Sequence, residues 1–212
     1  MNMLERDLQE IGTSAVRMLS MVREGLTFAR RGLIDADVAA ADRAIAGDAA
    51  VDALQNQLEQ QILTTIARRQ PAAKDLRFLG AMLQSLADIE RAGDYAVHVA
   101  RTGAELAGAP PLKKYLDMKR ILVVLDEMLE ATMRAMVEGD AEAARKALAM
   151  DDEIDDLYDQ IQRELLTYMM SDPATINAAT KLLMVARHLE RCGDHVENVN
   201  EHVIFWLSGR RI

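Results

Sequence analysis

The sequence has few of the residues that break helices or build strands. Only four of its 212 residues are proline and 4% are aromatic, whereas half are apolar. Strands need β-branched and aromatic runs, so this composition favours helices throughout. The single cysteine, Cys192, excludes an intrachain disulfide and a multi-cysteine zinc site, and it fits a reducing compartment.

Three further absences narrow the class of protein. No stretch approaches the roughly 20 uninterrupted apolar residues of a membrane helix, and the first residues lack the basic and apolar regions of a signal peptide. We therefore expect a cytoplasmic protein with no membrane insertion. The net charge is −9 and no basic face is concentrated anywhere, which argues against nucleic acid as a partner. The acidity can equally serve solubility alone.

Helical periodicity between breakers predicts six long helices. They cover about residues 3–31, 37–69, 73–107, 112–138, 141–170 and 174–207. Helices of this length pack as bundles. In the last segment Cys192 lies on an apolar stripe with helical spacing, so we expect it to be buried and unreactive.

The second half of the chain repeats the first. Glu-Arg-Ala-Gly-Asp at 90–94 returns as Glu-Arg-Cys-Gly-Asp 100 residues later, and an Asp-x-x-x-Asp motif beginning at Asp48 returns 103 residues later at Asp151. Pro71 lies between the two motifs of the first copy, as Pro173 does in the second. This ordered match indicates duplication. It predicts an all-α fold of two tandem three-helix bundles, with domains at 1–108 and 112–212.

Each copy carries two pairs of acids spaced four residues apart, which places each pair on one side of a helix. If the helices that flank each proline form an antiparallel hairpin, all four acids of a copy lie at one level, about 28 Å from the turn at 1.5 Å per residue. Such a cluster is costly unless protons, basic side chains or a metal neutralise it. The eight acids are Asp48, Asp52, Glu90, Asp94, Asp151, Asp155, Glu190 and Asp194.

Metal binding and a solvated acidic docking groove both remain open at this point. We expect Arg91 and Arg191 to point about 100° away from Glu90 and Glu190 and to be poor internal partners for them. Glycine at 93 and 193 removes a side chain beside the acids. All-oxygen ligation favours hard cations such as Mg²⁺, Mn²⁺ or Ca²⁺ and suits iron, but it offers nothing specific to zinc. His98 and Asn198 could extend the sites, although an ordinary surface role for His98 is the simpler interpretation.

Catalytic motifs are missing from the sequence. It contains no Glu-x-x-His pair, no phosphate-binding glycine loop, no Gly-x-Ser-x-Gly and no His-Glu-x-x-His. We therefore predict that the protein is not an enzyme. A metal-dependent hydrolase acting on phosphorylated compounds is the alternative.

Residues 67–77, 88–94 and 185–195, together with the two Asp-x-x-x-Asp motifs, resemble the PhoU family of phosphate-transport accessory proteins. The resemblance implies multinuclear metal clusters at the eight acids, often of iron, with Mg, Mn, Ca or Zn as alternatives. It also implies a negative regulator of phosphate uptake by the phosphate ABC transporter and of phosphate-starvation signalling. The expected partners are the transporter's ATPase subunit and a sensor histidine kinase, and a homodimer is expected. His98 departs from the asparagine common in the family, so the two sites can differ.

Overall fold

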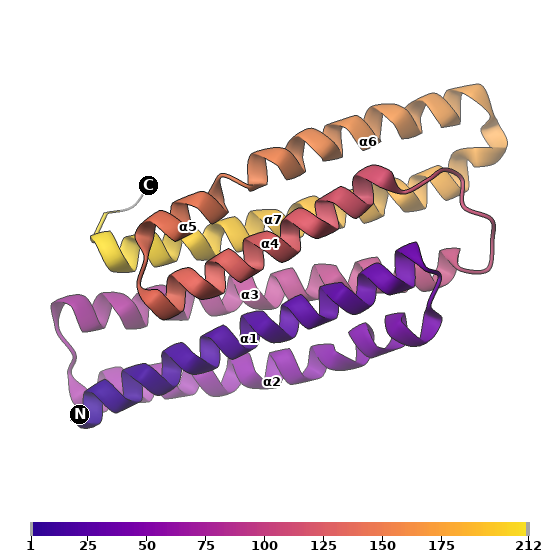
Figure 1. Cartoon of the computed structure of the whole chain (residues 1–212). Coiled ribbons are helices and arrows are strands. Elements are labelled where there is room, and N and C mark those ends of the chain that lie inside the picture. The colour runs from indigo at the N-terminus through magenta and orange to yellow at the C-terminus, as the bar shows by residue number, and fades with distance from the viewer. Residues whose placement is uncertain (1, 211–212) are drawn as a thin grey trace.

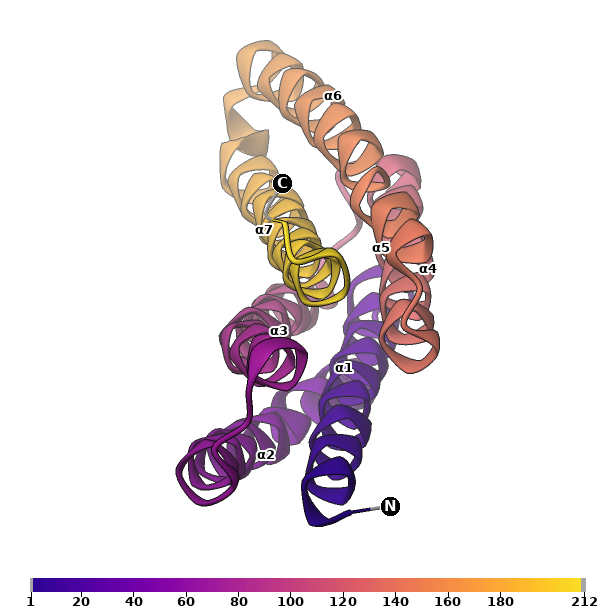
Figure 2. The same ribbon diagram turned by 90° about the vertical axis from the view of Figure 1, so that its left-hand side faces the viewer.

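The computed structural model describes residues 2–210, and all of its regular structure in that range is helical (Figure 1). Viewed from the end, the N-terminal unit, α1–α3, lies beside the C-terminal unit, α4–α7 (Figure 2). This arrangement confirms the predicted duplicated all-α fold. The helices are α1 Met3–Ile34, α2 Val38–Arg69, α3 Ala73–Leu106, α4 Leu116–Glu138, α5 Ala141–Leu148, α6 Asp151–Ser171, the short 3-10 helix Pro173–Thr175, and α7 Ile176–Ser208.

Local chemistry sets several helix ends. Asn2 and Glu5 form a capping box at the start of α1, each side chain accepting a 2.8 Å hydrogen bond from the other residue's backbone N–H. The helix α2 ends at Gln70, which adopts a left-handed conformation with φ 48° directly before Pro71. Gly139, with φ 66°, ends α4. These boundaries lie close to those predicted from the sequence.

The predicted helix over 141–170 is interrupted, and this part of the prediction was wrong. Asp140 caps α5 by accepting hydrogen bonds from the backbone N–H groups of Glu142 and Ala143. Ala149 and Met150 then separate α5 from α6. The break places Asp151 in the first turn of α6, whereas its counterpart Asp48 lies in the interior of α2.

The two units meet along α3 and α7, which run antiparallel between them (Figures 1 and 2). Asp88, in the middle of α3, contacts His202 near the end of α7, whereas His98 further along α3 stacks on His188 earlier in α7. At the midpoint the Cys192 thiol donates to the carbonyl oxygen of Ala92, with an S···O distance of 3.6 Å. Cys192 is fully buried, as predicted.

A second contact between the units joins α1 to α4. Arg23 donates two hydrogen bonds of 2.6 and 2.7 Å to the carboxylate of Asp126. Buried apolar side chains of both units form one continuous cluster, and the division into separate domains at 108 and 112 stays a prediction. Among the helices of residues 2–210, none combines the length and apolar content needed to cross a membrane.

Candidate metal centre

The second acid cluster, which consists of Asp151, Asp155, Glu190 and Asp194, joins α6 to α7. One carboxylate oxygen from each of Asp151, Asp155 and Asp194 lies within 4.8 Å of the other two. Asp151 is only 6% exposed. Glu190 is partly buried one turn before Asp194, and its pKa is raised by burial and by Asp194. The hairpin therefore gathers carboxylates from two helices into a space that one hard cation can span.

Asp151 is the most perturbed acid of this cluster. Burial raises its pKa to about 7, and repulsion from Glu197, Asp155, Asp194 and Glu190 adds to the effect. Its buried Oδ1 has no hydrogen-bond partner within the protein. A buried carboxylate oxygen without a donor is unfavourable unless a proton or a cation neutralises it. The chemistry of this position fits a metal ligand.

The Asp151 carboxylate can take its position because residue 193 is a glycine. A Cβ atom on this glycine would collide with Asp151 Oδ1 and would lie 3.1 Å from Ile154 Cδ1. The carboxylate thus occupies the space that any other residue at 193 would fill. Gly93 differs, because its Cβ would meet Val22 and Val51 at 3.4 and 3.8 Å rather than an acid. At Gly193 the space left by the missing side chain holds an acid, whereas Gly93 packs near two valines and lines a cavity beside Asp48.

The first acid cluster, which consists of Asp48, Asp52, Glu90 and Asp94, joins α2 to α3. Burial raises the pKa of Asp48, and Asp52 and Asp94 raise it further. The pKa of Glu90 rises through burial and through Asp94, Asp52 and Asp48. The four acids therefore act on one another electrostatically. Asp52 Oδ1 is buried without a hydrogen-bond partner in the protein, as Asp151 Oδ1 is in the second cluster.

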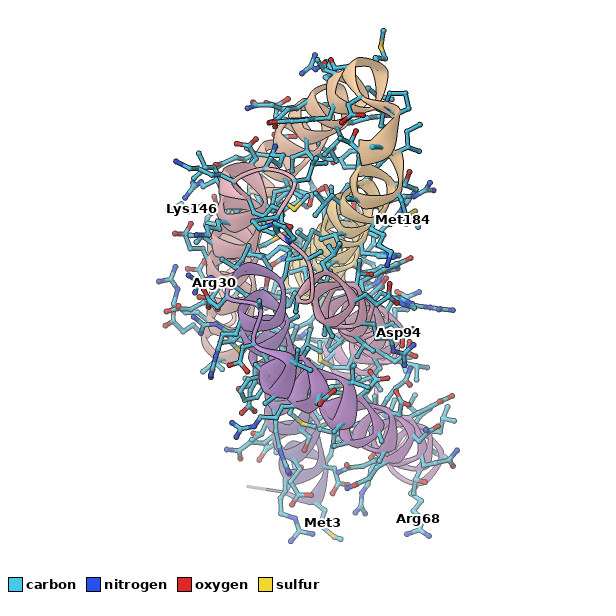
Figure 3. All side chains as sticks on the ribbon, turned by 90° about the vertical axis from the view of Figure 1, so that its right-hand side faces the viewer. Met3, Arg30, Arg68, Asp94, Lys146 and Met184 are labelled. Carbon is cyan, nitrogen blue, oxygen red and sulfur yellow. The ribbon has the colours of Figure 1, made fainter. Side chains whose placement is uncertain are left out.

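The first cluster is the looser of the two. Its four acids are all partly buried, whereas the second cluster combines the buried Asp151 with the exposed Asp155. Within residues 2–210 the trio in the second cluster is the one group of three acids whose oxygens approach within 4.8 Å. In Figure 3 Asp94 lies on the side of the molecule that carries Met184, opposite Arg30 and Lys146. The two clusters are related by sequence but differ in how closely their carboxylate oxygens approach one another.

The two arginines make only long contacts with Glu90 and Glu190, but each also reaches the aspartate three residues further along its helix. Arg191 donates a 2.9 Å hydrogen bond to Asp194 and approaches Glu190 within 3.6 Å. Arg91 reaches Asp94 at 3.4 Å and Glu90 at 3.9 Å. Although both Cα–Cβ bonds point aside, the long arginine side chain spans one helical turn. Both guanidinium groups are substantially exposed, so they offset only part of the charge from the solvent side.

Sequence reasoning missed a polar cluster around Asp88 at the α3–α7 interface. Its carboxylate pairs with His195 Nδ1 at 2.8 Å and with His202 Nε2 at 3.1 Å, and it accepts a 3.1 Å hydrogen bond from the side-chain amide of Asn198. Although burial raises the pKa of Asp88, these three hydrogen bonds outweigh it and hold that pKa well below its usual range. The side-chain amide nitrogen of Asn198 thus forms a hydrogen bond across the α3–α7 interface.

Ring stacking completes this interface. Tyr95 stacks on His195 with ring centroids 5.7 Å apart, and His98 stacks on His188 at 4.9 Å. His188, His195 and His202 are spaced seven residues apart, which places them on one line along α7. That spacing is a signal in the sequence that could have revealed the cluster. The residues of this Asp88 cluster lie on the same two helices as Glu90, Asp94, Glu190 and Asp194 and are interspersed with them.

Comparison with known proteins agrees with the duplication. The PhoU domain model matches residues 15–102 and again 118–203. A phosphate-specific transport system accessory protein PhoU homolog of Deinococcus radiodurans is 47% identical over 210 residues, covering 98% of each chain. A protein of the same name from Aquifex aeolicus is 35% identical over 89% of this chain and 85% of its own.

Solved structures share the arrangement. The crystal structure of PhoU from Pseudomonas aeruginosa has a TM-score of 0.93 and 31% identity, covering 97% of this chain and 99% of the other. The Streptococcus pneumoniae phosphate transport system regulatory protein PhoU, at 24% identity and a TM-score of 0.91, covers 99% of each chain and shares the fold. The fold and its paired acidic hairpins thus define a protein built from two PhoU domains. The chain belongs to the PhoU family.

Proposed function

We propose that the protein is a metal-binding cytoplasmic regulator of phosphate homeostasis. It would limit uptake by the phosphate ABC transporter and restrain phosphate-starvation signalling through a sensor histidine kinase. Relatives that cover nearly the whole chain are named as accessory proteins of phosphate transport, which supports the coarse part of this proposal. The transporter's ATPase subunit and the kinase are the proposed partners, and a homodimer is the proposed assembly.

The metal-binding part rests on one observation, the buried and unpartnered Oδ1 of Asp151 beside two further carboxylates. The eight acids of the two clusters are the proposed ligands, in multinuclear centres whose oxygen donors suit iron, Mg²⁺, Mn²⁺ or Ca²⁺. A bound cation would supply the positive charge that these carboxylates lack. Because each cluster draws ligands from two helices, the acids would then fasten α2 to α3 and α6 to α7.

We further propose that the protein is not an enzyme. Arg91 and Arg191 pair with acids of the two clusters and offset part of their charge. The four histidines lie at or beside the α3–α7 interface. A metal-dependent hydrolase could activate water on the metal itself, but it would also need side chains free to orient a phosphorylated substrate, and the observed contacts of these side chains are to other protein groups. Regulation through binding is therefore the better-supported function.

Metal analysis combined with a phosphatase assay tests the chemical part of the proposal. Protein purified without chelator is expected to contain metal and to show no turnover of a phosphate monoester. The Asp52→Asn/Asp151→Asn double variant should lose most of the metal. Asp42→Asn, an exposed acid on α2, is the matched control and should retain it. Turnover by the wild type that Asp52→Ala abolishes would overturn the regulator in favour of the hydrolase.

A pull-down from the source cells tests the regulatory part. The tagged protein is expected to recover the transporter ATPase and a sensor kinase, with a different yield at high and low phosphate. Deletion of the gene should raise phosphate uptake, and the wild-type chain should restore it. Recovery of neither partner, with unchanged uptake, would contradict the proposed regulation while leaving the metal result intact.

A further inference from the structure

The two units can be compared position by position. The PhoU domain matches begin at residues 15 and 118, and with this offset the buried residues of α1 fall on buried residues of α4, as Leu26 does on Leu129 and Leu33 on Met136. In α3 and α7 the acid motifs are 100 residues apart, so Val97 corresponds to Glu197. A neutral side chain in one unit therefore replaces a carboxylate in the other.

Glu197 faces the second acid cluster. It follows Asp194 by three residues and Glu190 by seven, so the three carboxylates share one side of α7. The side chain is partly buried, and among neighbouring charges it has the largest effect on Asp151. Its own pKa is raised by burial, then by Glu201, and then by Asp194 and Asp155 of the cluster. Glu197 thus lies on the side of α7 that carries the second cluster and acts electrostatically on Asp151, next to the three acids whose oxygens lie within 4.8 Å of one another.

Val97 occupies the corresponding place beside the first cluster. Val97, Asp48 and Gly93 line a cavity of about 270 Å³ between α1, α2 and α3. The side chain at this position therefore faces the counterpart of Asp151, which supports the orientation inferred for Glu197. Because valine has no ligand atom, the first cluster has only its four acids at this level.

Two glycines of the N-terminal unit leave space in this cavity because they have no side chain. Gly25 and Gly47 line it, and a Cβ on either would meet nothing within 4 Å. Their counterparts in the C-terminal unit are Met128, which is fully buried, and Met150, which packs against the core. Methionine side chains thus fill in the second unit the positions that are open in the first. Packing is therefore closer around Asp151 than around Asp48, although Asp155 of the second cluster is exposed.

We propose that Glu197 is a fifth carboxylate ligand of the second metal centre, and that this centre binds a divalent cation more tightly than the first. The inference rests on the proposed metal binding at the acid clusters. Its independent support is the buried, unpartnered Oδ1 of Asp151. Cation affinity of all-oxygen sites rises with the number of charged ligands and with the rigidity of the site. Both factors favour the second centre.

Calorimetric titration of the metal-free, full-length protein with Mn²⁺ tests the inference. The wild type is expected to show a tight and a weak class of binding. Glu197→Gln should weaken the tight class about tenfold or more and leave the weak class unchanged. Val97→Glu, which supplies the missing carboxylate, should strengthen the weak class. Glu127→Gln, an exposed acid on α4, controls for the change in net charge.

The outcomes separate the inference from the proposed function. If no Mn²⁺ binds to the wild type, the proposed metal centres fail and the inference fails with them. If Mn²⁺ binds but Glu197→Gln leaves every class unchanged, the proposed function stands and the fifth ligand is wrong. The conservative Gln substitution is expected to keep the circular dichroism spectrum of the metal-free protein and to raise its melting temperature, because it removes a charge that repels Asp151. A loss of affinity will therefore report ligation and not unfolding.

Discussion

Replacing Asp151 by Asn should stabilise the metal-free protein. Burial and repulsion raise the pKa of Asp151 from its ordinary 3.8 to about 7, so the folded state holds this proton more strongly than the unfolded state. At about 1.36 kcal/mol per pKa unit, keeping Asp151 ionised costs the folded protein about 4 kcal/mol above pH 7. Because the folded pKa is the raised one, this penalty is absent below pH 3.8, grows as the pH rises, and is complete above pH 7.

Urea unfolding followed by circular dichroism measures this penalty. In chelator-treated samples at pH 8, Asp151→Asn should have a higher free energy of unfolding than the wild type, by up to about 4 kcal/mol, and the gain should shrink at pH 5. Asp42→Asn should follow the wild type at both values. With saturating Mn²⁺ the order should reverse, because only the wild type gains the free energy of binding at the second centre. A variant that is no more stable than the wild type at pH 8 without metal would refute this reasoning.

Four further substitutions and one labelling experiment test the packing of the helices. Gly193→Ala should displace Asp151 and reduce Mn²⁺ binding in calorimetry, whereas Gly93→Ala should change it little. Gly103→Ala should lower the free energy of unfolding in urea by about 2 kcal/mol, because its Cβ would lie 2.8 Å from the backbone nitrogen of the facing helix α1. Asp88→Asn should cost about 2–4 kcal/mol in the same assay through weakened charge-assisted hydrogen bonds between the units. Burial raises the pKa of Cys192 to about 12, so a thiol reagent should react with it only after denaturation.

Most of the fold could be predicted because its signals are local. Capping residues, prolines and helical periodicity mark the helix ends, and the repeated motifs indicate the duplication. The break at Ala149 and Met150 could not be predicted, because neither residue disfavours a helix. The late start of α4 at Leu116 was missed for a similar reason, since helix-compatible residues follow Pro111. Tertiary packing decided both.

The sequence could predict that the acids of each hairpin lie at one level, because they are at equal distances from a turn. The electrostatic coupling within each cluster agrees with that spacing. The contacts of Asp88 could not be derived in the same way, because its partners lie more than 100 residues further along the chain, across the interface between the units. The packing beside the two clusters also differs, because Gly25 of α1 corresponds to the buried Met128 of α4. No sequence motif identifies this difference.

Anomalous diffraction from crystals of protein purified without chelator tests the central claim most directly. With data collected at the absorption edges of iron and manganese, the account predicts peaks between α2 and α3 beside Asp52 and Asp94, and between α6 and α7 beside Asp151 and Asp194. The second site should be the more fully occupied. Crystals of chelator-treated protein soaked in Mn²⁺ should show the same positions. An absence of peaks at both acid clusters after soaking would contradict metal binding there.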